Sequence, residues 1–199
     1  MRRLDYYIIV TADGLYADPD GGLDHYEPAE DEHQYANDLL RDAGEVVMGR
    51  AMYDVMTGYW DTVDVEDPSM ADVERDFTIQ WRTTPKHVVS RGQPALGPNA
   101  SLLEGDVVDA VRRLKAGTGG DINLGCGADL LATLGEVGLI DTYRLLVIPT
   151  ALGQGKALFR SLASPLRLHL VGTRTFASGS VLLEYEPART AATGGPAAD

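Results

Sequence analysis

The sequence is poor in cysteine and in long apolar runs, and each shortage excludes a class of protein. Cys126 is the single cysteine of the 199 residues, so no internal disulfide can form and no multi-cysteine metal site is available. No apolar run approaches the roughly 20 residues that a membrane span requires. The start of the chain, MRRLDYYIIV, has no signal-peptide cleavage pattern. We therefore expect a cytoplasmic protein with no membrane partner.

Cationic side chains are also scarce. Lysine and arginine number 17 against 30 aspartate and glutamate residues, which gives a formal net charge of −13. A field of this sign repels nucleic acid and anionic membranes, so we expect no nucleic-acid partner. A small phosphate-bearing ligand is still compatible with it, because a few arginines and backbone N–H groups can gather at one place.

Two families of catalytic motif are missing. The four histidines lie in unlike segments and show no metal-ligand spacing such as His-Glu-X-X-His, so we predict no metal site. The Gly-X-Ser-X-Gly pattern of hydrolases is absent as well. The chemistry has to be sought elsewhere in the chain.

Hydrophobic spacing predicts alternating strands and helices, followed by strands alone. The predicted strands are Leu4–Thr11, Glu45–Met48, Lys86–Ser90, Asp121–Leu124, Asp141–Ile148, Leu166–Arg174 and Val181–Glu186. The predicted helices are Asp31–Ala43, Arg50–Thr57, Ser69–Trp81, Val107–Lys115 and Ala128–Glu136, the fourth of them capped by Asp106. Between the first strand and the first helix, dense turn chemistry over residues 12–28 predicts a long mobile loop.

This order predicts one α/β domain over residues 1–187, with a disordered tail at 188–199. Its sheet is mixed and mostly parallel, with helices on both faces and a C-terminal antiparallel β-hairpin. A chain with 44% hydrophobic residues is long enough for one substantial core.

Two strand-to-helix junctions carry glycine where a ligand phosphate could approach a helix N-terminus. The first runs from Val46 to Tyr53 and contains Gly49-Arg50, whose guanidinium suits a phosphate. The second runs from Ile122 to Asp129 and contains Gly125-Cys126-Gly127. Each junction taken alone is equally compatible with a simple tight turn. A third strand ends in Ser90-Arg91, which suits a ribose phosphate or is only a solvated strand end.

Taken in order, these segments resemble the dihydrofolate-reductase-like superfamily, and in particular the family of the C-terminal reductase domain of riboflavin-biosynthesis enzymes, here as a stand-alone member. The resemblance extends from Leu4 to Pro187. It is carried by Thr11-Ala12-Asp13-Gly14, Val47–Tyr53, Val88–Arg91, the glycines around Cys126, Leu130–Leu134 with Gly138–Asp141, Leu152–Gly155 and Leu158-Phe159. The family's zinc deaminase half needs cysteines that this chain lacks.

The resemblance implies a three-layer fold with an NADPH site along one sheet edge. It places the pyrophosphate over the glycine turn before Ala128, Gly49 and Arg50 at the phosphates, and Ser90 with Arg91 at the adenosine 2′-phosphate. The full set of cofactor-binding candidates is Ala12, Gly49, Arg50, Ser90, Arg91, Leu124, Gly125, Cys126, Gly127, Ala128 and Asp129. Cys126 departs from the Gly-Gly that is common in the family.

The resemblance also places the substrate between the first strand, the 12–28 loop, the helix near Asp31 and the segment around Trp60. Asp13, Asp31 and Glu32 are the candidate catalytic carboxylates for orienting or protonating a nitrogen heterocycle. Their plainer interpretations are an Asx turn at Asp13 and dipole partners at Asp31 and Glu32. Trp60 is the candidate for stacking on a flat substrate, or else a core residue.

The leading hypothesis is an NADPH-dependent reductase of a small pyrimidine or pterin, acting as a homodimer that pairs through its apolar C-terminal strands. The alternative is a non-catalytic NADPH-binding dimeric module or sensor with the same fold, which is motivated by the lack of an unambiguous proton donor. A flavodoxin-like flavin protein is a third hypothesis, against which the antiparallel C-terminal strands argue.

Overall fold

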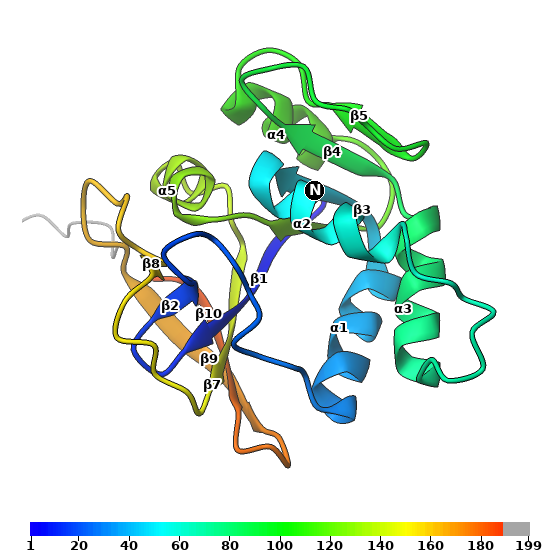
Figure 1. Cartoon of the computed structure of the whole chain (residues 1–199). Coiled ribbons are helices and arrows are strands. Elements are labelled where there is room, and N and C mark those ends of the chain that lie inside the picture. Colours follow the sequence, from blue (N-terminus) through cyan, green and yellow to red (C-terminus); the bar gives the residue numbers. More distant parts are fainter. Residues whose placement is uncertain (189–199) are drawn as a thin grey trace, which may run out of the picture.

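The protein is built around an eight-stranded mixed sheet, seen in a computed structural model that describes residues 1–188 (Figure 1). The strand order is β5 (Ala100–Leu102), β4 (Lys86–Val89), β3 (Ala43–Gly49), β6 (Asp121–Gly125), β1 (Leu4–Thr11), β7 (Thr142–Ile148), β10 (Val181–Pro187) and β9 (Leu168–Thr175). All neighbouring strands from β5 to β7 pair in parallel. β10 is antiparallel to β7, and β9 is antiparallel to β10. The predicted mixed, mostly parallel sheet with a C-terminal hairpin is confirmed.

β1 lies in the middle of the sheet because both of its faces are apolar. Leu4 and Tyr6 are fully buried on one face, and Tyr7 and Ile9 pack into a second cluster on the other. β1 pairs in parallel with β6 on one side and β7 on the other. A strand with two apolar faces requires helices above and below it.

One face of the sheet is covered by α4 (Val107–Ala116) and α5 (Ala128–Glu136). Val111, Leu131 and Leu134 are completely buried there, in one cluster with Leu4 and Tyr6. Asp106 begins α4 as predicted, since its side chain accepts a hydrogen bond from the Asp109 N–H at 3.0 Å.

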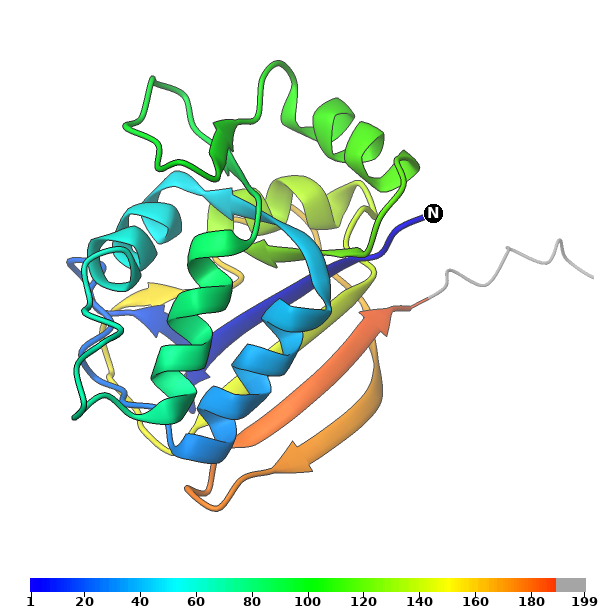
Figure 2. The same ribbon diagram turned by 90° about the vertical axis from the view of Figure 1, so that its right-hand side faces the viewer.

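The other face is covered by α1 (Glu30–Asp42) and α3 (Asp72–Thr83), which lie side by side (Figure 2). Leu40, Phe77 and Trp81 form a cluster there with Val46 and Met48 of β3. α2 (Arg50–Trp60) follows β3 directly and lies at the carboxyl ends of the strands. The predicted three layers are therefore present.

Three short strands escaped prediction. β2 (Leu15–Ala17), inside the predicted loop, pairs with β8 (Lys156–Ala157), and β5 adds an edge beside β4. Strands of two or three residues show no alternation, so only long-range backbone pairing reveals them. The backbone bond from Leu158 N–H to Gly14 O at 3.1 Å is an example.

The largest differences from the predicted helix boundaries are at the end of α2 and the start of α3. α2 passes through Gly58 and ends at Trp60, whose ring packs 4.6 Å from that of Phe77. This tertiary contact offsets the helix-breaking tendency of glycine. α3 begins at Asp72, since Asp67 binds the N–H of Ser69 in a preceding turn.

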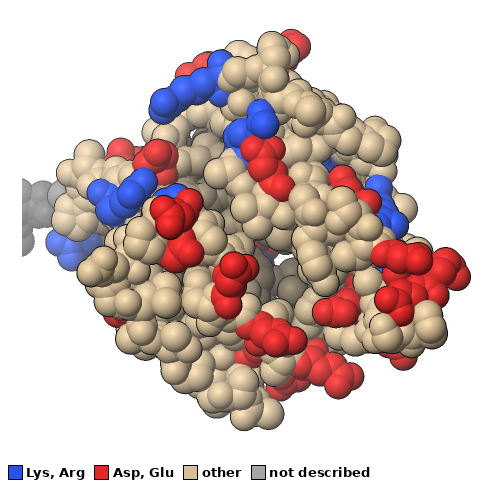
Figure 3. Space-filling view, in the orientation of Figure 1, with Lys and Arg blue, Asp and Glu red and all other residues tan. Residues whose placement is uncertain are grey.

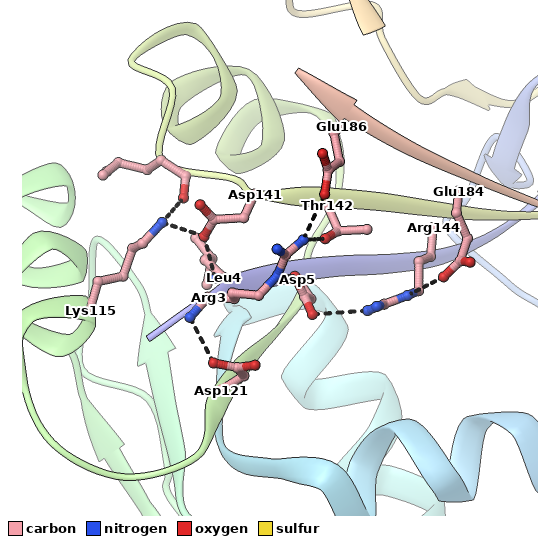
Figure 4. Close-up of polar contacts among 11 residues, drawn as sticks. Arg3, Leu4, Asp5, Lys115, Asp121, Asp141, Thr142, Arg144, Glu184 and Glu186 are labelled. Carbon is pink, nitrogen blue, oxygen red and sulfur yellow. Dashed lines mark hydrogen bonds and ion pairs between the residues drawn. The ribbon is translucent and has the colours of Figure 1, made fainter. Parts of the chain in front are cut away.

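A polar cluster fastens the strands at their amino ends (Figure 4). The buried Lys115 of α4 donates to Leu139 O at 2.6 Å and pairs with Asp141, whose carboxylate also accepts the Leu4 N–H at 2.7 Å. Arg144 of β7 bridges Asp5 of β1 and Glu184 of β10 at 3.1 and 2.7 Å, as the close-up shows. This end of the sheet is committed to structural contacts.

At the C-terminal end, the Ala188 N–H donates to Arg167 O at 2.9 Å. The remainder of the predicted tail, residues 189–199, lies outside the described residues.

Candidate functional site

The two glycine turns lie next to each other at the carboxyl ends of β3 and β6. These strands are parallel neighbours, and Met48 is in register with Gly125. A Cβ added to Gly49 would lie 3.4 Å from the Cβ of Cys126. The separate sequence motifs therefore form one continuous surface.

The helices behind these turns have N-termini without side-chain caps. Gly49 is the N-cap of α2 and Gly127 that of α5, and neither helix has a side-chain hydrogen bond at its cap. The first N–H groups of each helix are thus available to an anion, with the positive end of the helix dipole behind them. A phosphate-bearing dinucleotide fits this chemistry.

Tyr16 of β2 partly covers the second turn. A Cβ on Gly127 would meet its hydroxyl at 2.7 Å. A side chain at position 127 would therefore displace the phenol of Tyr16. A ligand at this turn would contact Tyr16 as well as the backbone.

Cys126 points away from the ligand surface. Its side chain is fully buried in the core cluster, and burial raises the pKa of its thiol. Its backbone carbonyl accepts a hydrogen bond from the Tyr6 hydroxyl at 2.9 Å. The departure from Gly-Gly consequently places no side chain over the turn.

The other cofactor candidates occupy three settings. Arg50 is half-exposed at the start of α2 and pairs with Asp54 at 2.6 Å. Ser90 and Arg91 follow β4, the strand next to β3; Ser90 Oγ accepts the Gly92 N–H at 3.2 Å and Arg91 is exposed. Asp129 accepts a hydrogen bond from Ser161 at 2.5 Å.

Three further candidates can offer only backbone atoms or a methyl group to a ligand. Leu124 and Ala128 are buried, so their side chains belong to the core. Ala12 is exposed just after β1, and its N–H donates to Thr150 O at 2.8 Å.

A cavity of about 280 Å³ adjoins the glycine turns. It lies between β1, α1, α2 and the segment from β2 to α1, which is where the family resemblance places the substrate. Figure 3 shows it as a hollow in the face of the molecule. Gly125, Met48 and Met52 are among its lining residues, so it reaches the ends of β3 and β6.

Glu32 is the carboxylate in this cavity. It is 1% exposed, at the start of α1. Oε1 accepts from the Ser178 hydroxyl at 2.5 Å, and Oε2 accepts from the Ala29 N–H at 2.8 Å and from the Tyr26 hydroxyl. Burial acts to raise the pKa of this carboxyl, but the hydrogen bonds outweigh burial and hold the pKa below its usual value. The group is therefore an anion at neutral pH.

The other two candidate carboxylates do not line the cavity. Asp13 is exposed and accepts bonds from Thr11 at 2.5 Å and from the Gly153 N–H at 2.7 Å, which lower the pKa of its carboxyl. Asp31, half-buried, accepts from the Ala177 N–H at 3.3 Å. Both carboxylates hold loops in place.

Trp60 does line the cavity. Its ring meets those of His33 and Phe77 at centroid distances of 5.7 and 4.6 Å. Trp60 is thus part of an aromatic wall as well as a packing residue.

Several polar cavity residues, among them His25 and Tyr26, were not predicted from the sequence. His25 and Tyr26 belong to a loop with no periodic pattern, so the sequence carries no sign that they turn inward. Nδ1 of His25 is buried without a hydrogen-bond partner within the described range. An unpaired buried nitrogen is unfavourable unless a ligand or water meets it.

The part of the chain that the structure describes has neither a metal-ligand cluster nor a membrane-spanning helix. No group of three or more potential metal ligands occurs among residues 1–188. In the same range, no helix has the length and apolar character needed to span a bilayer.

The mixed sheet, the adjoining glycine turns and the cavity beside them define a reductase-like α/β fold. The chain belongs to the RibD C-terminal domain family, which matches residues 4–182. The family resemblance seen in the motifs is thereby confirmed.

Three known proteins illustrate the likeness. The uncharacterized protein YyaP of Bacillus subtilis is 32% identical over 184 residues, covering 92% of this chain and 94% of YyaP. A putative riboflavin biosynthesis protein from Shewanella sp. PV-4 superposes with a TM-score of 0.71 at 21% identity, covering 95% and 100% of the two chains. Dihydrofolate reductase from Enterococcus faecalis, complexed with NADP(H) and RAB-propyl, superposes with a TM-score of 0.63 at 11% identity, covering 93% of this chain and 96% of that one. At these identities the two structures show the shared fold alone.

Proposed function

We propose that the protein is an NADPH-dependent reductase of a small, flat nitrogen heterocycle. The observation that carries the proposal is a cavity with a buried anionic carboxylate that opens onto the two glycine turns. The family membership and the NADP(H)-bound neighbour of the same fold support it.

In this proposal the cofactor lies along the carboxyl ends of β4, β3 and β6. The N-termini of α2 and α5 hold its phosphates, with Arg50 beside them, and Ser90 and Arg91 take the 2′-phosphate. When bound, NADPH supplies the hydride. The protein contributes alignment of the two partners and exclusion of water.

Glu32 is assigned to the substrate because, of the three candidate carboxylates, it alone lines the cavity. As an anion it accepts a hydrogen bond from a ring N–H. Tyr26 donates its hydroxyl to Glu32, and burial raises the pKa of that phenol, so Tyr26 holds its proton at neutral pH. The proton between the two groups therefore stays on the Tyr26 hydroxyl, next to the Glu32 carboxylate. Asp13 and Asp31 serve the loops.

Cofactor choice tests the phosphate assignment. Replacing Arg50, which is assigned to the phosphates that both nucleotides share, with alanine should weaken NADPH and NADH binding alike by calorimetry. Replacing Arg91 with alanine should weaken NADPH binding far more than NADH binding. An equal loss for both nucleotides in the Arg91 variant would remove the 2′-phosphate assignment.

Turnover separates the reductase from the non-catalytic alternative. Loss of the nicotinamide absorbance should accompany addition of one or more members of a pyrimidine and pterin panel. NADPH binding without oxidation by any of them would favour a binding module or sensor.

We also propose a homodimer that forms through the edge of the sheet at β9. Leu170 and Val171 on this strand are 47% and 51% exposed, and an apolar edge strand invites pairing. Solution scattering should give a molecular mass twice that of one chain, and the Val171→Asp variant should have the mass of a single chain. A monomeric mass for the unaltered protein would contradict the proposal.

A further inference from the structure

The cavity beside the glycine turns has the wrong charge for an anionic substrate. Among the described residues that line it, Glu32 is the only carboxylate, and neither lysine nor arginine is present. The walls are otherwise mostly aromatic, aliphatic or methionine side chains, with Tyr7, Trp60 and Phe77 among them. A phosphate or carboxylate placed here would find no lysine or arginine to replace its water.

The rim of the cavity carries the same charge. The segment from Asp18 to Glu32 contains seven acidic residues, and the chain has no lysine or arginine between Leu4 and Leu40. Figure 3 shows acidic side chains along the edge of the hollow, over the segment between β2 and α1. An anionic tail that extended out of the cavity on this side would meet like charge.

The cations in the neighbourhood lie elsewhere. Lys156 comes to this segment from β8, but its ammonium lies at Gly21, where it would be 2.6 Å from an added Cβ, and it is not among the cavity-lining residues. Arg50 follows Gly49 at the start of α2 and pairs with Asp54, and it is not among the cavity-lining residues either. Neither of these cations lines the cavity, although Lys156 offsets part of the negative charge of the rim segment.

We propose that the substrate is an uncharged or cationic planar heterocycle that carries no phosphate and no carboxylate tail. The inference rests on the proposed function, whose substrate class it narrows. It sets this chain apart from a reductase of phosphoribosylated pyrimidines, although the fold is shared. A volume of about 280 Å³ is just below the roughly 300–1,000 Å³ of ligand pockets, which suits a one- or two-ring molecule.

The inside of the cavity explains how such a ring is recognised. Its flat faces meet aromatic walls, and its N–H groups meet the Glu32 carboxylate. The buried, unpaired Nδ1 of His25 offers one more polar contact near the loop. Of these groups, the Glu32 carboxylate would be repelled by a negative charge on the ligand.

A matched pair of ligands tests the charge assignment. The probes are 5-amino-6-(ribosylamino)uracil and its 5′-phosphate, which differ only in the phosphate. Both tryptophans of the chain, Trp60 and Trp81, line the cavity, so quenching of tryptophan fluorescence reports its occupancy. At low salt the form without phosphate should bind at least tenfold more tightly. The ratio should shrink as salt screens the exposed rim.

Charge reversal at the rim supplies the matched variants. Asp24 and Glu27 are exposed. The double variant Asp24→Lys/Glu27→Lys should bind the 5′-phosphorylated pyrimidine at least threefold more tightly than the unaltered protein does, and it should bind the unphosphorylated pyrimidine equally well. Glu66→Lys changes an exposed residue of the α2–α3 loop, on the outer side of α3 in Figure 1, and should leave both ligands unaffected. Equal or tighter binding of the phosphate by the unaltered protein overturns the inference.

NADPH titration and oxidation are measured on the same samples, so the two proposals can fail separately. If the phosphorylated pyrimidine drives NADPH oxidation better than the unphosphorylated one, the proposed reductase activity stands and the proposed substrate class is wrong. If the protein binds the unphosphorylated pyrimidine more tightly but does not bind NADPH, the inferred selectivity of the cavity stands and the proposed reductase activity is wrong.

Discussion

Replacing Glu32 with glutamine removes the one negative charge of the cavity while keeping the shape of the side chain. The carboxylate accepts hydrogen bonds from Ser178, the Ala29 N–H and Tyr26. The amide of glutamine keeps one oxygen to accept them and turns its NH₂ toward the remaining donors. The hydroxyls of Ser178 and Tyr26 can rotate to accept, whereas the backbone N–H of Ala29 cannot.

The magnitude follows from the loss of charge. A hydrogen bond to a charged group contributes about 1.5–3 kcal/mol and a neutral one about 0.5–1.5 kcal/mol. Three donors share one carboxylate and are not additive, so the free energy of unfolding should fall by about 2–4 kcal/mol. One substrate N–H bond that loses charge assistance costs about 1–1.5 kcal/mol, or about a five- to tenfold loss in kcat/KM.

The pH dependence has a defined sign. Because the pKa of Glu32 is lowered in the folded protein, the carboxylate stabilises the fold at pH values above its unfolded pKa. That stabilisation is lost as the pH falls through the folded pKa. The stability of Glu32→Gln should therefore lie below that of the unaltered protein at pH 7 and approach it in acid.

Urea unfolding at several pH values and NADPH oxidation with the best heterocycle provide the measurements. Asp31→Asn is the matched control, because Asp31 is the neighbouring carboxylate and lies outside the cavity. The control should keep kcat/KM within twofold, and both variants should bind NADPH as the unaltered protein does. If folded Glu32→Gln turns over at the original kcat/KM, Glu32 does not contact the substrate.

Three further outcomes follow from buried groups. Burial raises the pKa of the Cys126 thiol, so it should resist a thiol reagent in the native protein and react fully in denaturant; fast native labelling would mean that the turn opens. Leu131→Ala, at a completely buried position, should lower the free energy of unfolding by about 2–5 kcal/mol, and a loss below 1 kcal/mol would show that α5 repacks. Burial opposes ionisation of Glu45, but His87 at 2.7 Å and Arg2 lower the pKa of its carboxyl. The free energy of unfolding of Glu45→Gln should therefore fall less steeply than that of the unaltered protein as the pH is lowered. An unchanged dependence of the unfolding free energy on acid pH would contradict this.

Strong local patterns made much of the fold predictable. β1 and α5 begin and end where predicted, because an apolar strand between turn residues and a helix between glycines leave little choice. β2 and β8 lack such a pattern and depend on each other across some 140 residues of chain. Their pairing is a tertiary fact that no local window contains.

The site divides in the same way. The sequence supplied three carboxylates, but it could not say which of Asp31 and Glu32 turns inward, since adjacent helical residues point about 100° apart. The turn at Ser178 decides this, from the far end of the chain. The placement of Gly49 beside Cys126 likewise depends on strand order.

The polar cluster around Lys115, Asp141 and Arg144 separates the parts of the molecule that must stay fixed from those that can vary. It locks the amino ends of the strands, whereas the cavity and glycine turns occupy the carboxyl ends. Substitutions in the segment between β2 and α1 can therefore accumulate without loosening the scaffold. A lineage built on this sheet is free to exchange one small molecule for another while its framework is inherited unchanged.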